Sequence, residues 1–232
     1  MGTLSSVRRR RSAVSRDDSA LIRFNMPYYE QTSDFTCGPA CVLMVLKHFE
    51  PRLRIDRGLE FEVWRKCNMI GIRGSDPYGL AVPFMDAGYE VLLLTQRKQV
   101  INAAQWRLRL RRRFTSDEVE LSLFGMTQNY SRALGRRLKV IIKRPVVSDI
   151  NRALEEGYVP IALVHMGVVH SLNIPHWVVV TGGDSELVRF NDPYPPKGHK
   201  GILLSHSKFQ KIIDDIGTRI GFSPSVLLVR KR

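Results

Sequence analysis

Hydrophobic and polar positions follow two different periods along this chain. Over about 38–49 the apolar residues cover most of a helical circumference, and Pro51 ends the run. That pattern predicts a largely buried helix. Near the C-terminus, HWVVVT and ELVRFN are rich in β-branched residues and are separated by GGDS, which predicts a β-hairpin. The two patterns place a buried helix early in the chain and an antiparallel hairpin late.

Weaker patterns complete an α+β arrangement. A helix is expected over 60–68, and another over 80–87 after the glycine-rich loop GIRGSDPYG. Strands are expected over 21–26, 89–94, 159–164 and 225–229, and later helices over 148–156 and 208–216. Residues 97–144 are predicted to be helical in pieces. Helices followed by a sheet formed mostly by the C-terminal half indicate an α+β domain.

Charge is concentrated in two segments of the chain. The net charge is +14, of which residues 1–20 carry +3 and residues 97–144 carry +10. We therefore expect a disordered basic tail at 1–20, and one domain over 21–232 with a basic helical insertion at about 97–144. That segment is compatible with nucleic acid or an acidic partner, or with a solvated basic face whose Trp106 packs inward.

Composition limits the class of protein. The chain is 44% hydrophobic, and it has no apolar run near the ~20 residues that span a bilayer and no apolar stretch typical of a secretory signal. Three cysteines argue against a disulfide framework and favour a reducing compartment, so we expect a cytoplasmic protein. No His or Cys spacing indicates zinc, and neither a metal nor a cofactor is expected.

Cys37 is a candidate nucleophile because of where it stands. It precedes Gly38 and Pro39 at the expected mouth of the first helix, and proline is tolerated only in a first turn. Backbone N–H groups and the helix dipole at that end stabilise a thiolate, which is the reactive form. Gly38 is expected to let a substrate backbone approach. The alternative is that Cys37 is a small buried hydrophobic residue.

A cysteine nucleophile needs an imidazole, and the imidazole needs an orienting group. His176 opens the first hairpin strand and Asp192 follows the second; if the hairpin turns about Asp184, the two lie opposite each other. The alternative is a strand-end histidine and an unrelated loop aspartate. Gln31, in the polar loop before Cys37, is a candidate oxyanion donor together with the Cys37 N–H.

Gln31, the CGPA at 37–40, the HWVVVTG at 176–182 and the NDP at 191–193 together resemble the papain-like cysteine peptidases. They are most similar to the group of leader-peptide-cleaving domains of bacteriocin exporters, which cut after a double glycine. The stretch VWRKCNMIGIRGSDPYGLAVPFMDAGYEV resembles the middle section of a stand-alone branch. The resemblance implies a papain-like fold, with an N-terminal helix carrying the cysteine packed on a C-terminal antiparallel sheet carrying the histidine and aspartate.

Carried over, the resemblance makes Cys37 the nucleophile, His176 the base, Asp192 its orienting group and Gln31 the oxyanion donor. No transmembrane or nucleotide-binding segment accompanies these motifs, so the double-glycine preference is not carried over. The leading hypothesis is a thiol hydrolase acting on a peptide or amide bond of a peptide or protein substrate. An acyl or peptidyl transferase uses the same machinery and stays open, as do a basic binding module and a pseudoenzyme.

Overall fold

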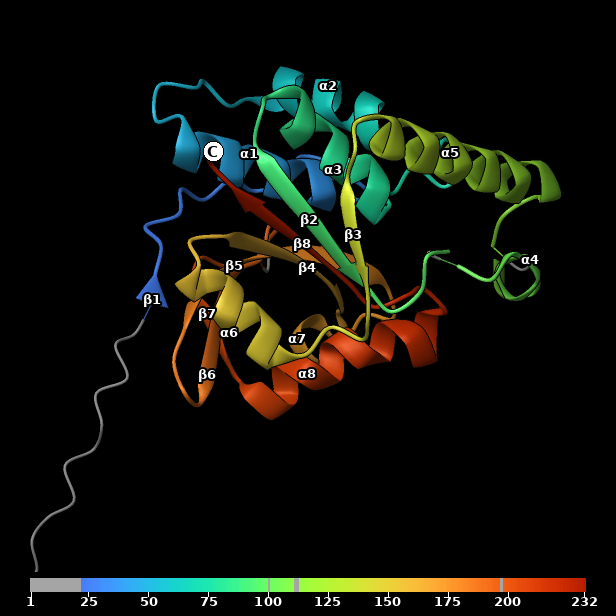
Figure 1. The fold of residues 1–232 in the computed structure, drawn as a ribbon. Helices are drawn as coiled ribbons and strands as arrows, with labels where there is room; N and C mark the ends of the chain where they lie inside the picture. Colours follow the sequence, from blue (N-terminus) through green and yellow to red (C-terminus); the bar gives the residue numbers. More distant parts are fainter. Residues whose placement is uncertain (1–21, 100, 111–112, 197) are drawn as a thin grey trace, which may run out of the picture.

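The computed structural model describes residues 22–99, 101–110, 113–196 and 198–232 of the 232-residue chain, so the predicted tail at 1–20 lies outside the described residues. Within them, one sheet forms the centre of the fold, with strand order β3–β2–β8–β4–β5–β6–β7 and β1 paired to β5 (Figure 1). The strands are β1 (Ile22–Arg23), β2 (Glu90–Thr95), β3 (Lys139–Ile142), β4 (Val159–His165), β5 (Pro175–Gly183), β6 (Leu187–Asn191), β7 (Ile202–Ser205) and β8 (Ser225–Arg230).

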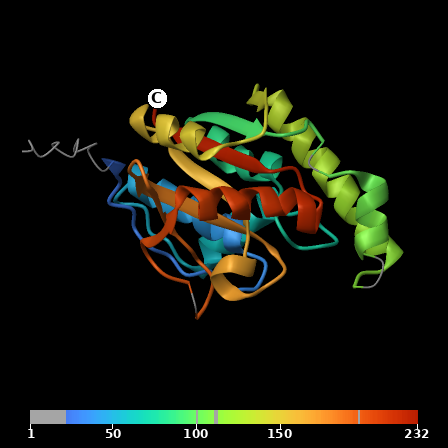
Figure 2. The same cartoon turned by 90° about the horizontal axis from the view of Figure 1, so that it is seen from below.

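Helices cover both faces of this sheet. One face packs against α1 (Cys37–Phe49) and α3 (Pro77–Asp86), and α2 (Arg57–Cys67) and α5 (Ser116–Gly135) pack on these two helices. The other face packs against α6 (Val147–Glu155) and α8 (His206–Asp215), which lie in front of the sheet in Figure 2. A short α4 (Ala103–Leu110) lies against α5, and α7 (Gly167–His170) precedes β5. A π-helical turn, Ile216–Ile220, follows α8.

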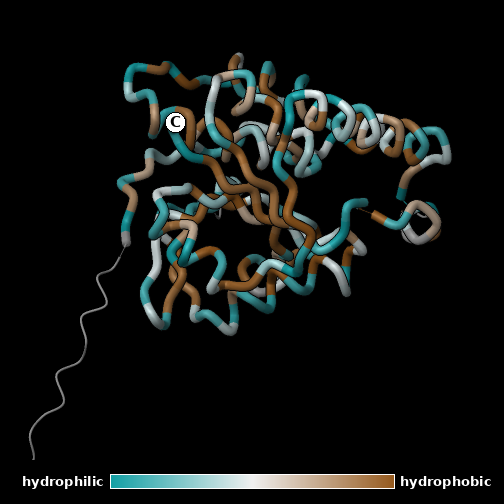
Figure 3. Tube along the Cα trace, viewed as in Figure 1, coloured by the Kyte–Doolittle hydropathy of each residue, from teal (hydrophilic) through white to brown (hydrophobic). Residues whose placement is uncertain are grey.

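Burial on both faces explains the continuous hydrophobic runs of the central strands. Every residue of β4 is buried, and consecutive valines of β5 alternate between two cores: Val179 belongs to the α1 side and Val178 to the α8 side. A strand covered on both faces needs apolar residues at successive positions, whereas a half-exposed strand alternates. Figure 3 shows the neighbouring strands β2 and β8 of the same sheet as a hydrophobic band through the centre of the molecule. Each fully buried Val or Leu contributes about 1.5–3 kcal/mol of transfer free energy.

The α+β architecture predicted from the sequence is confirmed, with the cysteine helix packed on the sheet that carries the histidine and aspartate. All strand pairs are antiparallel within the described residues except β2–β3, which is parallel. The middle segment differs from the prediction. Besides helices it supplies β3, a short edge strand on which Ile141 and Ile142 are exposed, so its run of four residues has no alternating pattern. That residues 97–144 are an insertion into a domain of residues 21–232 stays a prediction.

Gly38 has a structural reason that the sequence interpretation missed. A Cβ at this position would lie 2.8 Å from a methyl group of Leu80 and 3.1 Å from Cβ of Ser75. The glycine therefore allows the first turn of α1 to pack closely on the start of α3. The space that we expected a substrate backbone to use is filled by the protein itself.

None of the helices in the described part of the chain has the length and apolar content that crossing a bilayer requires.

Candidate active site

The first turn of α1 leaves its N–H groups available. Thr36 is the N-cap, but its hydroxyl donates to the carbonyl of Ser33, and within the described residues its side chain makes no capping hydrogen bond to the helix. Cys37 is the first helical residue and is half-buried. The Gly38 N–H donates to its sulfur, as does the backbone N–H of Trp177 on β5. The Cys37 sulfur is therefore bound by one N–H group of the uncapped first turn and by one N–H group of β5.

The hairpin brings His176 and Asp192 together. His176 is the second residue of β5, Asp192 directly follows β6, and the His176 Nε2 lies 2.8 Å from the Asp192 Oδ1. The observed register pairs Val179 with Asn191, which is offset by two residues from the predicted pairing of 176 with 192. An even offset keeps side chains on the same face of a sheet, so the contact survives the error in register.

Cys37 and His176 form a hydrogen-bonded pair that favours charge separation. Burial by itself opposes ionisation of Cys37, but the charge and hydrogen bond of His176, with the two backbone N–H groups, hold the pKa of Cys37 below its usual value. Burial also opposes protonation of His176, but the charge of Cys37 and the carboxylate of Asp192 raise the pKa of His176 to about 9. Because Nε2 faces Asp192, the other ring nitrogen, Nδ1, is left for Cys37.

Asp192 is a fully buried carboxylate satisfied by three donors. His176 and the Tyr194 N–H reach Oδ1, the latter at 2.9 Å, and the Nε2 of His170 lies 2.6 Å from Oδ2. Burial alone would raise the pKa of Asp192, but its bonds to His176, to the Tyr194 N–H and to His170 hold that pKa below the usual range. A buried carboxylate with this many donors stays ionised and fixed in place.

His170 is a functional candidate to which the sequence interpretation gave no role beside Asp192. It is the last residue of α7, its side chain is 4% exposed, and its ring packs on Tyr194 at 5.2 Å between centroids. The Tyr194 ring also contacts His176 edge-on at 5.9 Å. The sequence offered only a histidine six positions before His176, because the loop between them has no period that would orient His170.

Gln31 lies in the loop before α1, beside the aspartate. Its side chain is buried, its Nε2 donates to the Ser33 carbonyl at 2.8 Å, and its backbone N–H donates to the carbonyl of Pro193 at 2.9 Å. Among the described residues, its Oε1 has no hydrogen-bond partner. Nε2 carries a second hydrogen beyond the one given to Ser33, which an oxyanion requires. The role of Gln31 as oxyanion donor stays a prediction.

Cys37 lines a cavity of about 610 Å³, large enough for several residues of a peptide. Trp177 and Leu163 of the sheet form one wall, and the loop 69–75 with Phe114 and Glu118 forms another. Most of its lining side chains are apolar, and the charged ones are Asp34, Arg73 and Glu118. The nucleophile candidate thus faces a largely apolar cavity with a few charged groups.

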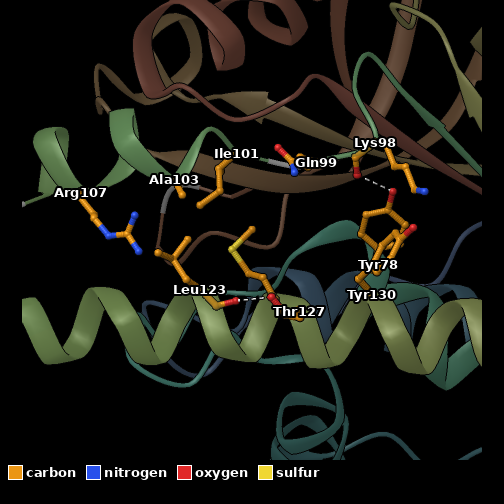
Figure 4. A pocket seen from close by; sticks show the side chains of 10 residues that line it. Tyr78, Lys98, Gln99, Ile101, Ala103, Arg107, Leu123, Thr127 and Tyr130 are labelled. Carbon is orange, nitrogen blue, oxygen red and sulfur yellow. Dashed lines mark hydrogen bonds between the residues drawn. The ribbon is translucent and has the colours of Figure 1, made fainter.

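A second cavity, of about 580 Å³, lies beside α5 (Figure 4). Its walls come from α5 with Leu123 and Tyr130, from Tyr78 of α3, and from Lys98 and Arg107. The Tyr78 hydroxyl donates to the Lys98 carbonyl at 2.8 Å. The lining of this second cavity does not overlap that of the cavity at Cys37.

A sequence model of the Peptidase_C39 like family matches residues 26–212, which include Gln31, Cys37, His176 and Asp192. The chain belongs to the Peptidase_C39 like family. The resemblance drawn from the sequence is therefore confirmed at the level of the family. No curated protein matches the chain.

Three solved structures are similar to this chain. The peptidase domain of Streptococcus ComA, a bifunctional ABC transporter of a quorum-sensing pathway, is 13% identical, with a TM-score of 0.46 over 88% of this chain and 97% of that one. A double-glycine-motif protease of an AMS/PCAT transporter, solved with its leader peptide, is 15% identical, with a TM-score of 0.44 over 90% and 94%. A C39-like peptidase of Bacillus anthracis is 11% identical, with a TM-score of 0.46 over 92% and 98%.

Iodoacetamide should alkylate Cys37 before the other two cysteines. Burial raises the pKa of Cys41 well above its usual value and that of Cys67 to about 12, whereas the pKa of Cys37 is lowered. A thiol with a lowered pKa stays ionised as the pH falls, so Cys37 should keep reacting well below the ~8.5 of an ordinary thiol. Mass spectrometry of tryptic peptides after a short pulse at several pH values measures this, with denatured protein as the control. Equal labelling of all three cysteines in the folded protein would contradict the charge-separated pair of Cys37 and His176.

Replacing His170 by Phe should slow acylation of Cys37 by p-nitrophenyl acetate about tenfold. The variant keeps a ring against Tyr194 but removes one charge-assisted hydrogen bond to Asp192, worth about 1.5–3 kcal/mol, part of which should appear in the rate. His176→Ala should remove nearly all acylation, and Asp192→Asn should leave some. His48→Phe, on the opposite end of α1, is the matched control. If His170→Phe is acylated at the wild-type rate while Asp192→Asn is acylated more slowly, the role of His170 is limited to packing on Tyr194.

Proposed function

We propose that this protein is a cysteine peptidase that hydrolyses a peptide or amide bond through Cys37, His176 and Asp192, with Gln31 as oxyanion donor. The observation that carries the proposal is one chain of contacts. A half-buried thiol at an uncapped helix N-terminus pairs with a histidine, which is bound to a buried, three-donor carboxylate. Family membership supports the same class of reaction.

The reaction starts from the Cys37 thiolate and the His176 imidazolium. The thiolate attacks the substrate carbonyl, and a C–S bond forms while the carbonyl electrons move to oxygen. The Cys37 N–H and the Gln31 amide stabilise that oxyanion. As the C–N bond breaks, His176 gives its proton to the leaving amine. Neutral His176 then takes a proton from water, which attacks the thioester and releases the acid and the thiolate.

Asp192 fixes the imidazole during these steps. Its hydrogen bond to Nε2 keeps Nδ1 towards the sulfur and stabilises the charged ring. Burial and the other hydrogen bonds of the Asp192 carboxylate hold that carboxylate in place. The raised pKa of His176, about 9, keeps the ring protonated near neutral pH, as protonation of the leaving amine requires.

The substrate is proposed to be a peptide or protein segment bound in the cavity at Cys37. One structural neighbour was solved with its leader peptide, and a cavity of about 610 Å³ with an apolar lining suits a peptide of apolar side chains. No preference for a double glycine is proposed. Cytoplasmic location stays a prediction.

A nucleic acid or an acidic partner at 97–144 stays a prediction with no observation that favours it. Several Lys and Arg side chains of this segment already form ion pairs with Asp or Glu side chains. Such pairing is consistent with a solvated basic face. These pairs are Arg107–Glu120, Arg136–Asp86, Lys143–Asp149 and Arg144–Asp214. Trp106 packs inward on Phe222, as the solvated-face alternative expected.

A thioester on Cys37 should form from a peptide library and disappear in plain buffer. The test is intact-mass spectrometry of the acyl-enzyme, chased with water alone or with added amines, and Cys37→Ala serves as the control that cannot form it. Loss of the added mass without an amine supports hydrolysis. A thioester that persists until an amine arrives would assign the protein to acyl transfer. Absence of any adduct on a thiol that iodoacetamide labels would contradict both.

A further inference from the structure

Glu60 is a buried acid outside the catalytic chain of contacts. It lies on α2 and is 0% exposed. Three donors from the loop before α1 reach its carboxylate: the Thr32 N–H at 2.9 Å, the Thr32 hydroxyl at 2.6 Å and the Tyr29 hydroxyl at 3.0 Å. Burying a carboxylate is costly unless such donors satisfy it, so these bonds hold the loop to α2 firmly.

The residues that Glu60 binds flank Gln31 in the chain. Thr32 is the next residue and Tyr29 stands two residues before, so the backbone on both sides of Gln31 is fixed to α2. The opposite side of the same loop is fixed to the aspartate segment. Gln31 N–H donates to the Pro193 carbonyl at 2.9 Å, and the Tyr28 hydroxyl donates to the Asp192 carbonyl at 3.0 Å. The loop is thus held between α2 and the residues that follow β6.

We propose that Glu60 is the positioning residue of the oxyanion donor: by binding Tyr29 and Thr32, it sets where the Gln31 amide stands relative to Cys37. This inference rests on the proposed function, because it assigns Glu60 a part in forming the same acyl-enzyme. Glu60 touches no reacting atom and acts through Gln31. A donor contributes to catalysis only where the oxyanion develops, and a displacement of about 1 Å costs up to roughly a hundredfold in rate.

Two reagents separate this role from the reactivity of the thiol. Acylation of Cys37 by p-nitrophenyl acetate passes through an oxyanion, whereas alkylation by iodoacetamide displaces iodide and forms no oxyanion. Loss of an oxyanion donor therefore slows the first reaction and leaves the second unchanged. The ratio of the two rate constants reports the donor without any knowledge of the natural substrate.

Thr32→Val and Tyr29→Phe each remove one hydroxyl bond to Glu60 with little change in volume. Each should lower the acylation-to-alkylation ratio by between about tenfold and a hundredfold. Glu60→Ala should lower this ratio further. Glu60→Gln keeps an oxygen for the Thr32 N–H, so its ratio should lie between those of the hydroxyl variants and that of Glu60→Ala. Tyr158→Phe is the matched control, because the Tyr158 hydroxyl makes the same kind of bond, at 2.7 Å, to Glu90.

A double-mutant cycle with Gln31→Ala tests whether Glu60 acts through Gln31. If it does, Thr32→Val should add almost nothing to the loss already caused by Gln31→Ala. Additive losses would overturn the inference, as would wild-type ratios in both hydroxyl variants beside an impaired Gln31→Ala. A wild-type ratio in Gln31→Ala would also overturn it. Failure of the proposed function looks different: Cys37 would then be inert to both reagents in the wild-type protein.

Discussion

The candidate site depends on the hydrogen bonds that the ionised carboxylate of Asp192 accepts. It is fully buried, so every one of its contacts must come from the protein. It receives His176 from the start of β5, His170 from α7 and the N–H of Tyr194 from its own segment. Its backbone carbonyl accepts the Tyr28 hydroxyl, and its N–H donates to the carbonyl of His199. One residue thereby joins the hairpin, the loop before α1 and the segment after β6.

The packing of the fold makes this arrangement rigid. α1 lies on β5 with Cys41 donating to the Trp177 carbonyl at 3.3 Å, and the Trp177 indole N–H donates to the carbonyl of Ser75 at 3.0 Å. Gly38 allows Leu80 of α3 to approach the same turn. The N-terminus of the helix is therefore fixed in place beside His176. A preorganised pair of this kind stabilises charge without a reorganisation of solvent, which is the main advantage of a buried site.

Local pattern was sufficient to predict the three central residues of the candidate site. The helix start at Cys37 follows from proline and glycine in its first turn, and the hairpin places His176 near Asp192 even with a register error of two residues. Both features depend on residues close in the chain. The contact between the helix and the hairpin is long-range, and it was predicted from the family resemblance.

What the sequence did not reveal depends on tertiary contacts. His170 ends α7, a helix of four residues that is too short to show a period in the sequence. Glu60 stands on a helix face that binds other residues only when the loop at Tyr29 and Thr32 folds onto it. The edge strands β3 and β7 were missed because each has only four residues, and their strand conformation comes from pairing with β2 and β6. The reason for Gly38 required knowledge of its neighbour, Leu80.

The thiolate–imidazolium pair is tested most directly by measuring the protonation state of the His176 ring as a function of pH. Nitrogen-15 NMR of histidine-labelled protein follows its titration, with the His176→Gln variant used to assign the signal. We predict that the His176 imidazolium persists to about pH 9. In Cys37→Ala its pKa should fall, because the charge of Cys37 is a main cause of the rise. A ring that titrates near 6.5 in both proteins would contradict the thiolate–imidazolium pair.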